Sequence, residues 1–218
     1  YSAGEEVQEK EASFRYDLNG IWKFHYARNY GSAIPGFEKE EYCCRDWDDI
    51  RVPAHIQMEG YDAPQYANVQ YPWEGHEDIH PGEIPEHFNP VASYVKYFTV
   101  PEHMKGKRLF ISFQGAESGL ALWLNGAFVG YSEDSFTPSE FELTDYLKDG
   151  QNKLAAQVFK WTSSSWYGSE LIHERHRHRF EFNNEFKQEL TDAFACNVTN
   201  ISVSIDTCFL ICCKSLIY

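Results

Sequence analysis

One segment of the chain, residues 52–73, concentrates side chains that are suited to binding a ligand. Its sequence, VPAHIQMEGYDAPQYANVQYPW, is rich in tyrosine, proline and amide side chains and poor in long aliphatic ones. This composition does not favour a helix or a strand, and it is typical of a surface loop that carries a binding function. Prolines stiffen the wider segment 53–90, and irregular segments of that length are usually functional.

Paired carboxylates are a second pattern with possible chemistry, because acids and bases in catalysis are often Asp and Glu. They occur here as Glu40/Glu41 and Asp48/Asp49. Both pairs fall on predicted loops or strand ends. Adjacent carboxylates in such places are usually solvated surface charge, since an unpaired charge is costly to bury. We therefore predict that this chain contains no catalytic residues.

Residue types that bind metals are present, but their spacing does not match a metal site. Five histidines lie in or near residues 53–90: His55, His76, His80, His87 and His103. Their intervals are irregular, whereas zinc sites use short fixed spacings completed by Cys or carboxylates. A second group, His173, His176 and His178, alternates with arginines that would repel a cation. We predict no metal site in the chain.

The six cysteines do not form the pattern of a disulfide framework. Cys43 and Cys44 are adjacent, and the other four lie in the last 23 residues. This distribution favours a reducing compartment. Residues 1–13 are acidic and polar, so they do not match a signal peptide, and we expect them to be a poorly ordered lead-in. The prediction is a cytoplasmic protein.

The charge of the chain excludes two classes of partner. The formal net charge is −14, which disfavours binding to nucleic acid or to an anionic membrane surface. The chain contains no run of 18 apolar residues that could span a membrane. A neutral small-molecule ligand is compatible with both observations.

The elements that must position the segment 52–73 are β-strands. Aromatic residues make up 17% of the chain, and they alternate with polar ones in several short segments. In residues 20–26, Trp22 and Phe24 fall on one side, which we expect to face a core. Asn125-Gly126 separates two apolar runs and predicts a hairpin turn. The predicted strands cover residues 20–26, 46–52, 92–100, 107–115, 120–124, 127–132, 140–143 and 153–161.

Short strands with turns every 8–12 residues predict an all-β protein, an antiparallel β-sandwich over residues 14–162. No helix of convincing length is expected before residue 166. Residues 153–161 should form a central strand of the sandwich. The predicted core includes Trp22, Phe24, Phe98, Leu109, Ile111, Phe113, Leu122, Leu124 and Val158.

From residue 14 to residue 166 the motifs resemble the sugar-binding jelly-roll domain of family 2 β-galactosidases. The segment GYDAPQYANVQYP is specific to the β-galactosidase branch of the family. The strings FQG, LWLNG and VGY, in residues 113–131, are shared with β-glucuronidases and mannosidases. Further matching pieces are LNGIWKF (18–24), NPVASYVKYFTV (89–100) and NKLAAQVFKW (152–161).

The resemblance implies a role for residues 66–69 in sugar binding. Asn68 would form a hydrogen bond with bound galactose, and Tyr66 and Val69 would shape the pocket wall. An amide can both donate to and accept from a hydroxyl group, which suits this role. In the family, a separate barrel domain carries the two glutamates of the retaining mechanism. We therefore expect weak β-galactoside binding without hydrolysis; the alternative is a free-standing carbohydrate-binding module.

The resemblance stops after Trp166, where the family continues with a Leu-Glu-Asp-Gln-Asp motif whose last Asp binds sugar and sodium. Full-length relatives use Mg and Na and are homo-oligomers. The sodium ligand has no counterpart here, so we expect no cofactor in this chain and no oligomer.

Residues 170–193 resemble instead a segment of the glutamine amidotransferase domain of CTP synthase, in which Arg179 would face a glutamine carboxylate. Neither the nucleophilic Cys nor the His-Pro-Glu motif of that class is present. Residues 194–218 resemble no family. The expected organisation is a lead-in (1–13), a jelly-roll domain (14–166) and an unrelated appendage (167–218) that is irregular or partly helical. We expect this tail to make few contacts with the sandwich, and its last residues to form a strand with an exposed edge.

Overall fold

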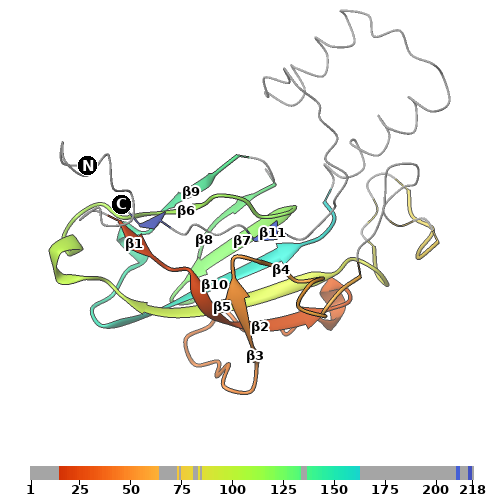
Figure 1. Cartoon of the computed structure of the whole chain (residues 1–218), viewed down its shortest axis with the longest axis horizontal. Helices are drawn as coiled ribbons and strands as arrows, with labels where there is room; N and C mark the ends of the chain where they lie inside the picture. The colour runs from red at the N-terminus through yellow and green to blue at the C-terminus, as the bar shows by residue number, and fades with distance from the viewer. Residues whose placement is uncertain are drawn as a thin grey trace, which may run out of the picture.

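The chain folds as an antiparallel β-sandwich, as the sequence predicts (Figure 1). The computed structural model describes residues 15–63, 73, 75–80, 83, 85–133 and 137–162, together with the backbone of 210–211 and 216–217. In this part of the chain the helices are three-residue 3-10 turns: η1 (Tyr30–Ser32), η2 (Glu102–Met104) and η3 (Thr144–Tyr146). None of the helices among these residues is long and apolar enough to cross a membrane.

The larger sheet has six strands in the order β3-β2-β5-β10-β7-β8. Their bounds are β2 (Gly20–Ala27), β3 (Asp48–Val52), β5 (Val91–Thr99), β7 (Gly119–Leu124), β8 (Ala127–Ser132) and β10 (Gln151–Phe159). Strand β10 pairs with β5 along all nine of its residues and with β7 on its other side. The prediction of a central strand at residues 153–161 is therefore confirmed, apart from its last two residues.

The second sheet has four strands in the order β1-β12-β6-β9, and a two-stranded ladder joins β11 to β4. Their bounds are β1 (Tyr16–Asp17), β4 (Ala54–His55), β6 (Phe110–Phe113), β9 (Ser139–Glu142), β11 (Leu210–Ile211) and β12 (Leu216–Ile217). The prediction of an exposed edge is wrong for β12, which pairs with β1 on one side and with β6 on the other. The apolar, β-branched composition indicates a strand, but it does not identify the partners.

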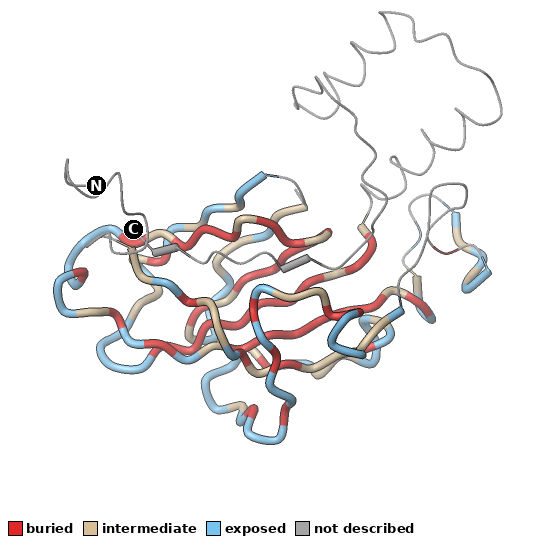
Figure 2. The backbone as a smooth tube through the Cα atoms, viewed as in Figure 1, coloured by how far each residue is buried: buried red, intermediate tan, exposed pale blue. Residues whose placement is uncertain are grey.

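The core lies between the two sheets and consists of alternate residues of their strands (Figure 2). Trp22 and Phe24 on β2 are 1% and 0% exposed. Ile21, the residue before Trp22, is 57% exposed. This confirms the predicted alternation, in which one face of a strand is buried and the other is not. All nine predicted core residues are buried in this cluster. Gly130 on β8 allows close packing between the sheets, because a Cβ there would lie 2.6 Å from the Phe141 ring.

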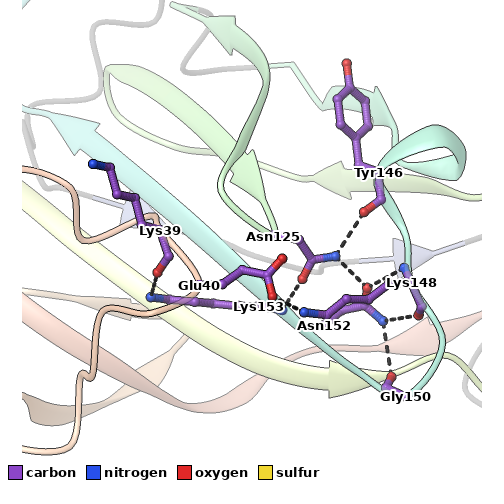
Figure 3. A network of polar contacts seen from close by, with 8 residues as sticks. All are labelled: Lys39, Glu40, Asn125, Tyr146, Lys148, Gly150, Asn152 and Lys153. Atoms are coloured by element: carbon purple, nitrogen blue, oxygen red, sulfur yellow. Dashed lines mark hydrogen bonds and ion pairs between the residues drawn. The ribbon is translucent and has the colours of Figure 1, made fainter.

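The predicted hairpin joins β7 to β8 at Asn125 and Gly126, whose φ angles of 51° and 83° are both left-handed. A type I′ turn requires positive φ at both positions, which Asn-Gly tolerates best. The Asn125 side chain also fixes the turn to its surroundings. Its amide donates to the Tyr146 carbonyl (2.9 Å) and to Oδ1 of the fully buried Asn152 (2.8 Å), as Figure 3 shows. The turn is thus tied to the start of β10.

The segment 33–47 covers the outer face of the larger sheet. Phe37, Cys44 and Trp47 pack on Val95 of β5 and Ala155 of β10. A buried lysine on β10 holds this segment in place: Lys153 Nζ donates to three backbone carbonyls, those of Phe37 (2.8 Å), Lys39 (2.5 Å) and Tyr42 (2.9 Å). Figure 3 shows the contact with Lys39. Desolvation by burial lowers the pKa of Lys153. Neutral carbonyl oxygens here replace the water around an ammonium group.

Candidate functional site

The predicted binding residues Tyr66, Asn68 and Val69 lie outside the described residues, in the interval 64–72. The structure does describe the two flanks of that interval, which are residues 52–63 and Trp73. These flanks are the described part of the candidate site.

The first flank is fixed to the core directly after β4. The turn is closed by backbone hydrogen bonds from Met58 to His55 (2.9 Å) and from Tyr61 to Ile56 (3.1 Å). Ile56 is fully buried, and the Tyr61 ring packs edge-on against Phe24 with a centroid distance of 4.5 Å. Edge-to-face aromatic pairs of this kind stabilise beyond their buried area. Residues up to 61 are thus held by the apolar core.

A buried ion pair follows at Asp62. Its Oδ2 lies 2.6 Å from Nζ of Lys160, the residue after β10, and the two side chains are 7% and 3% exposed. The Tyr26 hydroxyl donates to the other carboxylate oxygen of Asp62 at 3.3 Å. Desolvation by burial, followed by the nearby Asp62 charge, raises the pKa of Tyr26, so this phenol remains a donor at neutral pH.

Lys160 is itself positioned through its backbone. Its N–H donates to the Pro90 carbonyl (2.9 Å), and its carbonyl accepts from the Ser118 hydroxyl (3.0 Å). Its ammonium lies 5.9 Å from the Phe88 ring centroid and 5.4 Å from that of Trp161. Aromatic faces at this distance attract a cation.

The second flank, Trp73, returns to the same place. Its ring packs edge-on against Trp161 with a centroid distance of 6.3 Å, and these two residues form a small buried cluster with Phe88. The two ends of the interval 64–72 therefore rest on neighbouring residues at the end of β10, Lys160 and Trp161.

A second carboxylate, that of Glu117 on the β6–β7 connection, lies close enough to Lys160 to be affected by its charge. Desolvation by burial raises the pKa of Glu117 to about 7, although the Lys160 charge acts in the opposite direction. Glu117 therefore exchanges its proton close to neutral pH, and it adds a negative charge near Lys160 when it ionises.

The segment after Trp73 is closed by Glu77. Its carboxylate accepts from the backbone N–H groups of Glu86 (2.7 Å), His87 (3.0 Å) and Phe88 (3.0 Å). Desolvation by burial raises the pKa of Glu77, but these three donors together outweigh it and bring the pKa below its usual value. A carboxylate that accepts several N–H donors is stabilised in its charged form. Glu77 is thereby joined to residues 86–88, the last of which, Phe88, belongs to the cluster.

The acidic pairs lie where the sequence predicts, on the surface. Glu40 forms an ion pair with Lys148, and Asp49 forms one with Lys23 at 2.9 Å. All four side chains are partly or largely exposed, at 28–58%. Asp48 is also exposed. These carboxylates lie on the surface, and the absence of a catalytic role stays a prediction.

No group of three or more metal-ligating side chains comes together in the part of the chain that the structure describes. Of the cysteines described there, Cys43 is exposed, Cys44 is buried, and both are free thiols. His173, His176, His178 and Arg179 lie outside the described residues, as do the side chains of the last four cysteines. The predictions about cofactors and about that segment therefore stay predictions.

Sequence reasoning missed Asp62, Lys160 and Glu117. One signal was available: Lys160 stands between Val158, Phe159 and Trp161 at the end of an apolar strand. A lysine in an apolar run is rarely buried unless it is paired. The sequence does not identify the partner of Lys160, because 98 residues separate Lys160 from Asp62.

Comparison with known proteins places this architecture in a family. Residues 15–187 match the model of the family described as glycosyl hydrolases family 2, sugar binding domain. The match extends beyond Trp166, where the sequence resemblance was expected to stop, and it overlaps the first part of the amidotransferase-like segment. It includes both flanks and the interval 64–72.

Curated relatives match over most of this chain. A β-galactosidase of Halalkalibacterium halodurans is 53% identical over 167 residues, which are 76% of this chain and 16% of the relative. A β-galactosidase of Clostridium acetobutylicum is 50% identical over 76% of this chain and 19% of the relative. The chain thus spans less than a fifth of the length of these relatives. A solved β-glucuronidase of glycoside hydrolase family 2 superimposes with a TM-score of 0.51 at 25% identity, over 69% of this chain and 14% of that one.

Proposed function

Because the chain belongs to the sugar-binding domain family of the family 2 glycosyl hydrolases, we propose that it is the sugar-binding domain of a β-galactosidase and that residues 66–69 contact a bound β-galactoside. The observation that carries this proposal is the identity of about half of the aligned residues with β-galactosidases. The geometry supports it, since both flanks of the interval are fixed at the end of β10.

In this proposal Asn68 is the polar contact with the sugar. Its amide donates to one hydroxyl and accepts from another, while Tyr66 and Val69 form the wall beside it. One loop offers few contacts, and sugar hydroxyls exchange protein partners for water at small net gain. We expect a dissociation constant in the millimolar range or weaker. A millimolar constant corresponds to a binding free energy of about −4 kcal/mol.

The hydrolysis itself is assigned, as part of the proposal, to regions of the longer relatives outside this chain. A retaining glycosidase needs two carboxylates at roughly 5–5.5 Å around the scissile bond. The acidic pairs that the sequence offers lie on the surface, and one carboxylate of each pair forms an ion pair with a lysine. Turnover of a chromogenic β-galactoside by the purified chain, above a blank and lost on heating, would contradict this assignment.

The binding proposal is tested by saturation-transfer difference NMR on the full chain. Methyl β-D-galactoside should receive saturation, and methyl β-D-glucoside should receive much less. Asn68→Ala should remove the galactoside signal, whereas Asn19→Ala, a matched substitution in the turn before β2, should keep it. Equal signals for the two sugars, or an unchanged signal in Asn68→Ala, would overturn the role of residues 66–69.

A second candidate, a free-standing carbohydrate-binding module, is favoured by exposed aromatic rings. Tyr30 (61% exposed) pairs with Phe159 at 5.9 Å, and Phe128 (55% exposed) pairs with Trp123 at 5.7 Å. Exposed rings of this kind can stack on the apolar face of a sugar. Sub-millimolar binding of lactose or a β-glucan that is lost in Tyr30→Ala or Phe128→Ala would favour this candidate over the first.

For residues 170–193 we keep the amidotransferase likeness as a proposal about the origin of the tail. It predicts no glutaminase activity, because that reaction needs a nucleophilic Cys activated by a His and Glu. The test is ammonia release from glutamine by the full chain. Release above background would show that the segment retains a function of its own.

A further inference from the structure

The buried ion pair at the end of β10 is an unusual way to attach a loop. Removing two charges from water costs several kcal/mol, and a pair of packed apolar side chains is often equally stable or more stable. The neighbouring Trp73–Trp161 contact shows that this part of the sandwich also supports apolar packing. Stability alone therefore does not explain why Asp62 and Lys160 are charged.

The ion pair fixes the position of Asp62 more narrowly than an apolar contact would. An apolar contact tolerates sliding, whereas Asp62 is held through both of its oxygens, by Lys160 at 2.6 Å and by Tyr26 at 3.3 Å. Tyr26 lies on β2 and Lys160 follows β10, so these two contacts fix the position of the Asp62 carboxylate relative to two strands of the larger sheet. A buried polar contact that fixes register is the best-attested use of such groups.

Lys160 can serve as a fixed reference because its own backbone is tied on both sides. Pro90 accepts from its N–H, and Ser118 donates to its carbonyl. The next residue is fixed in the same way: Trp161 N–H donates to Asn89 Oδ1 at 3.0 Å, and the Asn89 amide donates to the Trp161 carbonyl at 2.9 Å. Residues 160–161 are therefore a rigid platform for residues 62 and 73.

We propose that Asp62 and Lys160 are positioning residues for the sugar-binding site: their ion pair, on the platform of residues 160–161, sets where the flanks of the interval 64–72 leave the sandwich. This proposal deepens the proposed function and, for its effect on sugar binding, rests on it. Neither side chain is assigned a contact with the sugar. They act by fixing the flank from which residues 66–69 follow.

The test separates position from stability by an apolar replacement of the whole pair. In the full chain, Asp62→Leu combined with Lys160→Met removes both charges and keeps apolar volume, so neither member of the ion pair is left buried without its partner. We expect this double variant to fold with a melting temperature near that of the unchanged chain. We also expect its affinity for methyl β-D-galactoside to fall about tenfold, the equivalent of roughly 1.4 kcal/mol.

A second readout does not depend on sugar. The indole N–H signals of Trp73 and Trp161 report the flank and the platform, and Trp22, whose indole donates to the Leu18 carbonyl at 2.9 Å, reports the core. In the double variant the Trp73 indole should exchange with solvent about tenfold faster, because local opening becomes easier. The Trp22 indole should not change. Lys153→Met, the same substitution at the buried lysine near the start of β10, should leave the Trp73 signal unchanged.

The outcomes distinguish the two proposals. If the unchanged chain binds no galactoside but the Trp73 signal responds as expected, the positioning inference stands for the flank and the proposed function fails. If the double variant is folded, with unchanged Trp73 exchange and unchanged galactoside affinity, the positioning inference is overturned. If Lys153→Met alters the Trp73 signal as strongly as the double variant does, the effect is general loosening of the sheet, and the inference is again overturned.

Discussion

Two lysines at opposite ends of β10 both bury their ammonium groups, but the partners of the two groups differ. Lys153, near the start of β10, donates to three neutral backbone carbonyls, whereas Lys160, just past its end, forms an ion pair with a buried carboxylate. Both residues are 3% exposed. Each holds a long irregular segment against the sandwich. The segment that Lys153 holds covers a sheet face, and the one that Lys160 holds leads to the candidate binding residues.

The difference lies in what remains when the lysine is lost. Without Lys153, polar but uncharged carbonyls are left without that donor. Without Lys160, a carboxylate stays buried with a weak phenol contact at 3.3 Å. A buried charge costs far more than a buried dipole, so the ion-paired end of the strand should be the more sensitive one.

The largest effect is expected for Lys160→Met. This change leaves Asp62 buried without its cation, which should lower the free energy of unfolding by about 3–5 kcal/mol. Urea denaturation followed by tryptophan fluorescence measures it. Adding Asp62→Leu should recover most of the loss. A cost no larger than that of Lys153→Met would remove the contrast between the two ends of β10.

Glu117 makes the Lys160 end sensitive to pH in the neutral range. Its pKa in the folded state, about 7, lies above the ordinary value of 4.5, so the folded chain binds this proton more tightly than the unfolded chain does. The resulting stabilisation is complete below about pH 4.5 and is lost as the pH rises through about 7, by roughly 3 kcal/mol in total. Denaturation curves between pH 5 and pH 8, a window set by these two values, should show the decline, and Glu117→Gln should flatten it. A decline that persists in Glu117→Gln must come from another group.

An intermediate effect is expected for Lys153→Met. Hydrogen bonds from a charged group contribute about 1.5–3 kcal/mol, but relief from burying the ammonium offsets part of that loss, so the net cost should be about 2 kcal/mol. The depressed pKa of Lys153 reflects the same burial. Because Lys153 holds residues 37–42, limited proteolysis should also cut this segment faster. Faster cutting near Trp73 instead would contradict the statement that Lys153 holds residues 37–42 and not the flanks of the interval 64–72.

The smallest effect is expected for Asp49→Asn, which breaks an ion pair on the surface. Lys23 and Asp49 are 28% and 58% exposed, so water and salt screen their attraction. The free energy of unfolding should change by less than about 1 kcal/mol. A loss comparable to that of Lys160→Met would show that burial is not what separates these ion pairs.

The sequence predicts the sandwich well because its signals are local. The alternation of Trp22 and Phe24 with exposed residues, and the left-handed turn at Asn125-Gly126, depend on side chains that are close in the chain. They determine a strand face and a hairpin whatever the rest of the chain does. Each predicted strand overlaps one in the structure. The two-residue strands β1 and β4 were not predicted, and β4 lies in the segment 52–73, whose composition was wrongly taken to disfavour any strand.

The anchoring contacts could not be predicted in the same way. Lys153 meets its carbonyl partners across 111–116 residues, and Lys160 meets Asp62 across 98. No periodicity encodes such pairs, because they arise only when the sheet has brought its strands together. The position of β12 between β1 and β6 is a further example. Tyr66, Asn68 and Val69 were proposed from motif likeness, and their role stays a prediction.

A titration of the isotope-labelled full chain with methyl β-D-galactoside, followed through its ¹H–¹⁵N spectrum, tests directly whether residues 66–69 bind the sugar beside the Trp73 flank. We predict the largest chemical-shift changes at the Asn68 side-chain amide and the Trp73 indole, and no change at the Trp22 indole. Shifts confined to residues around Tyr30 and Phe128, or none at sugar concentrations well above the millimolar range, would contradict it.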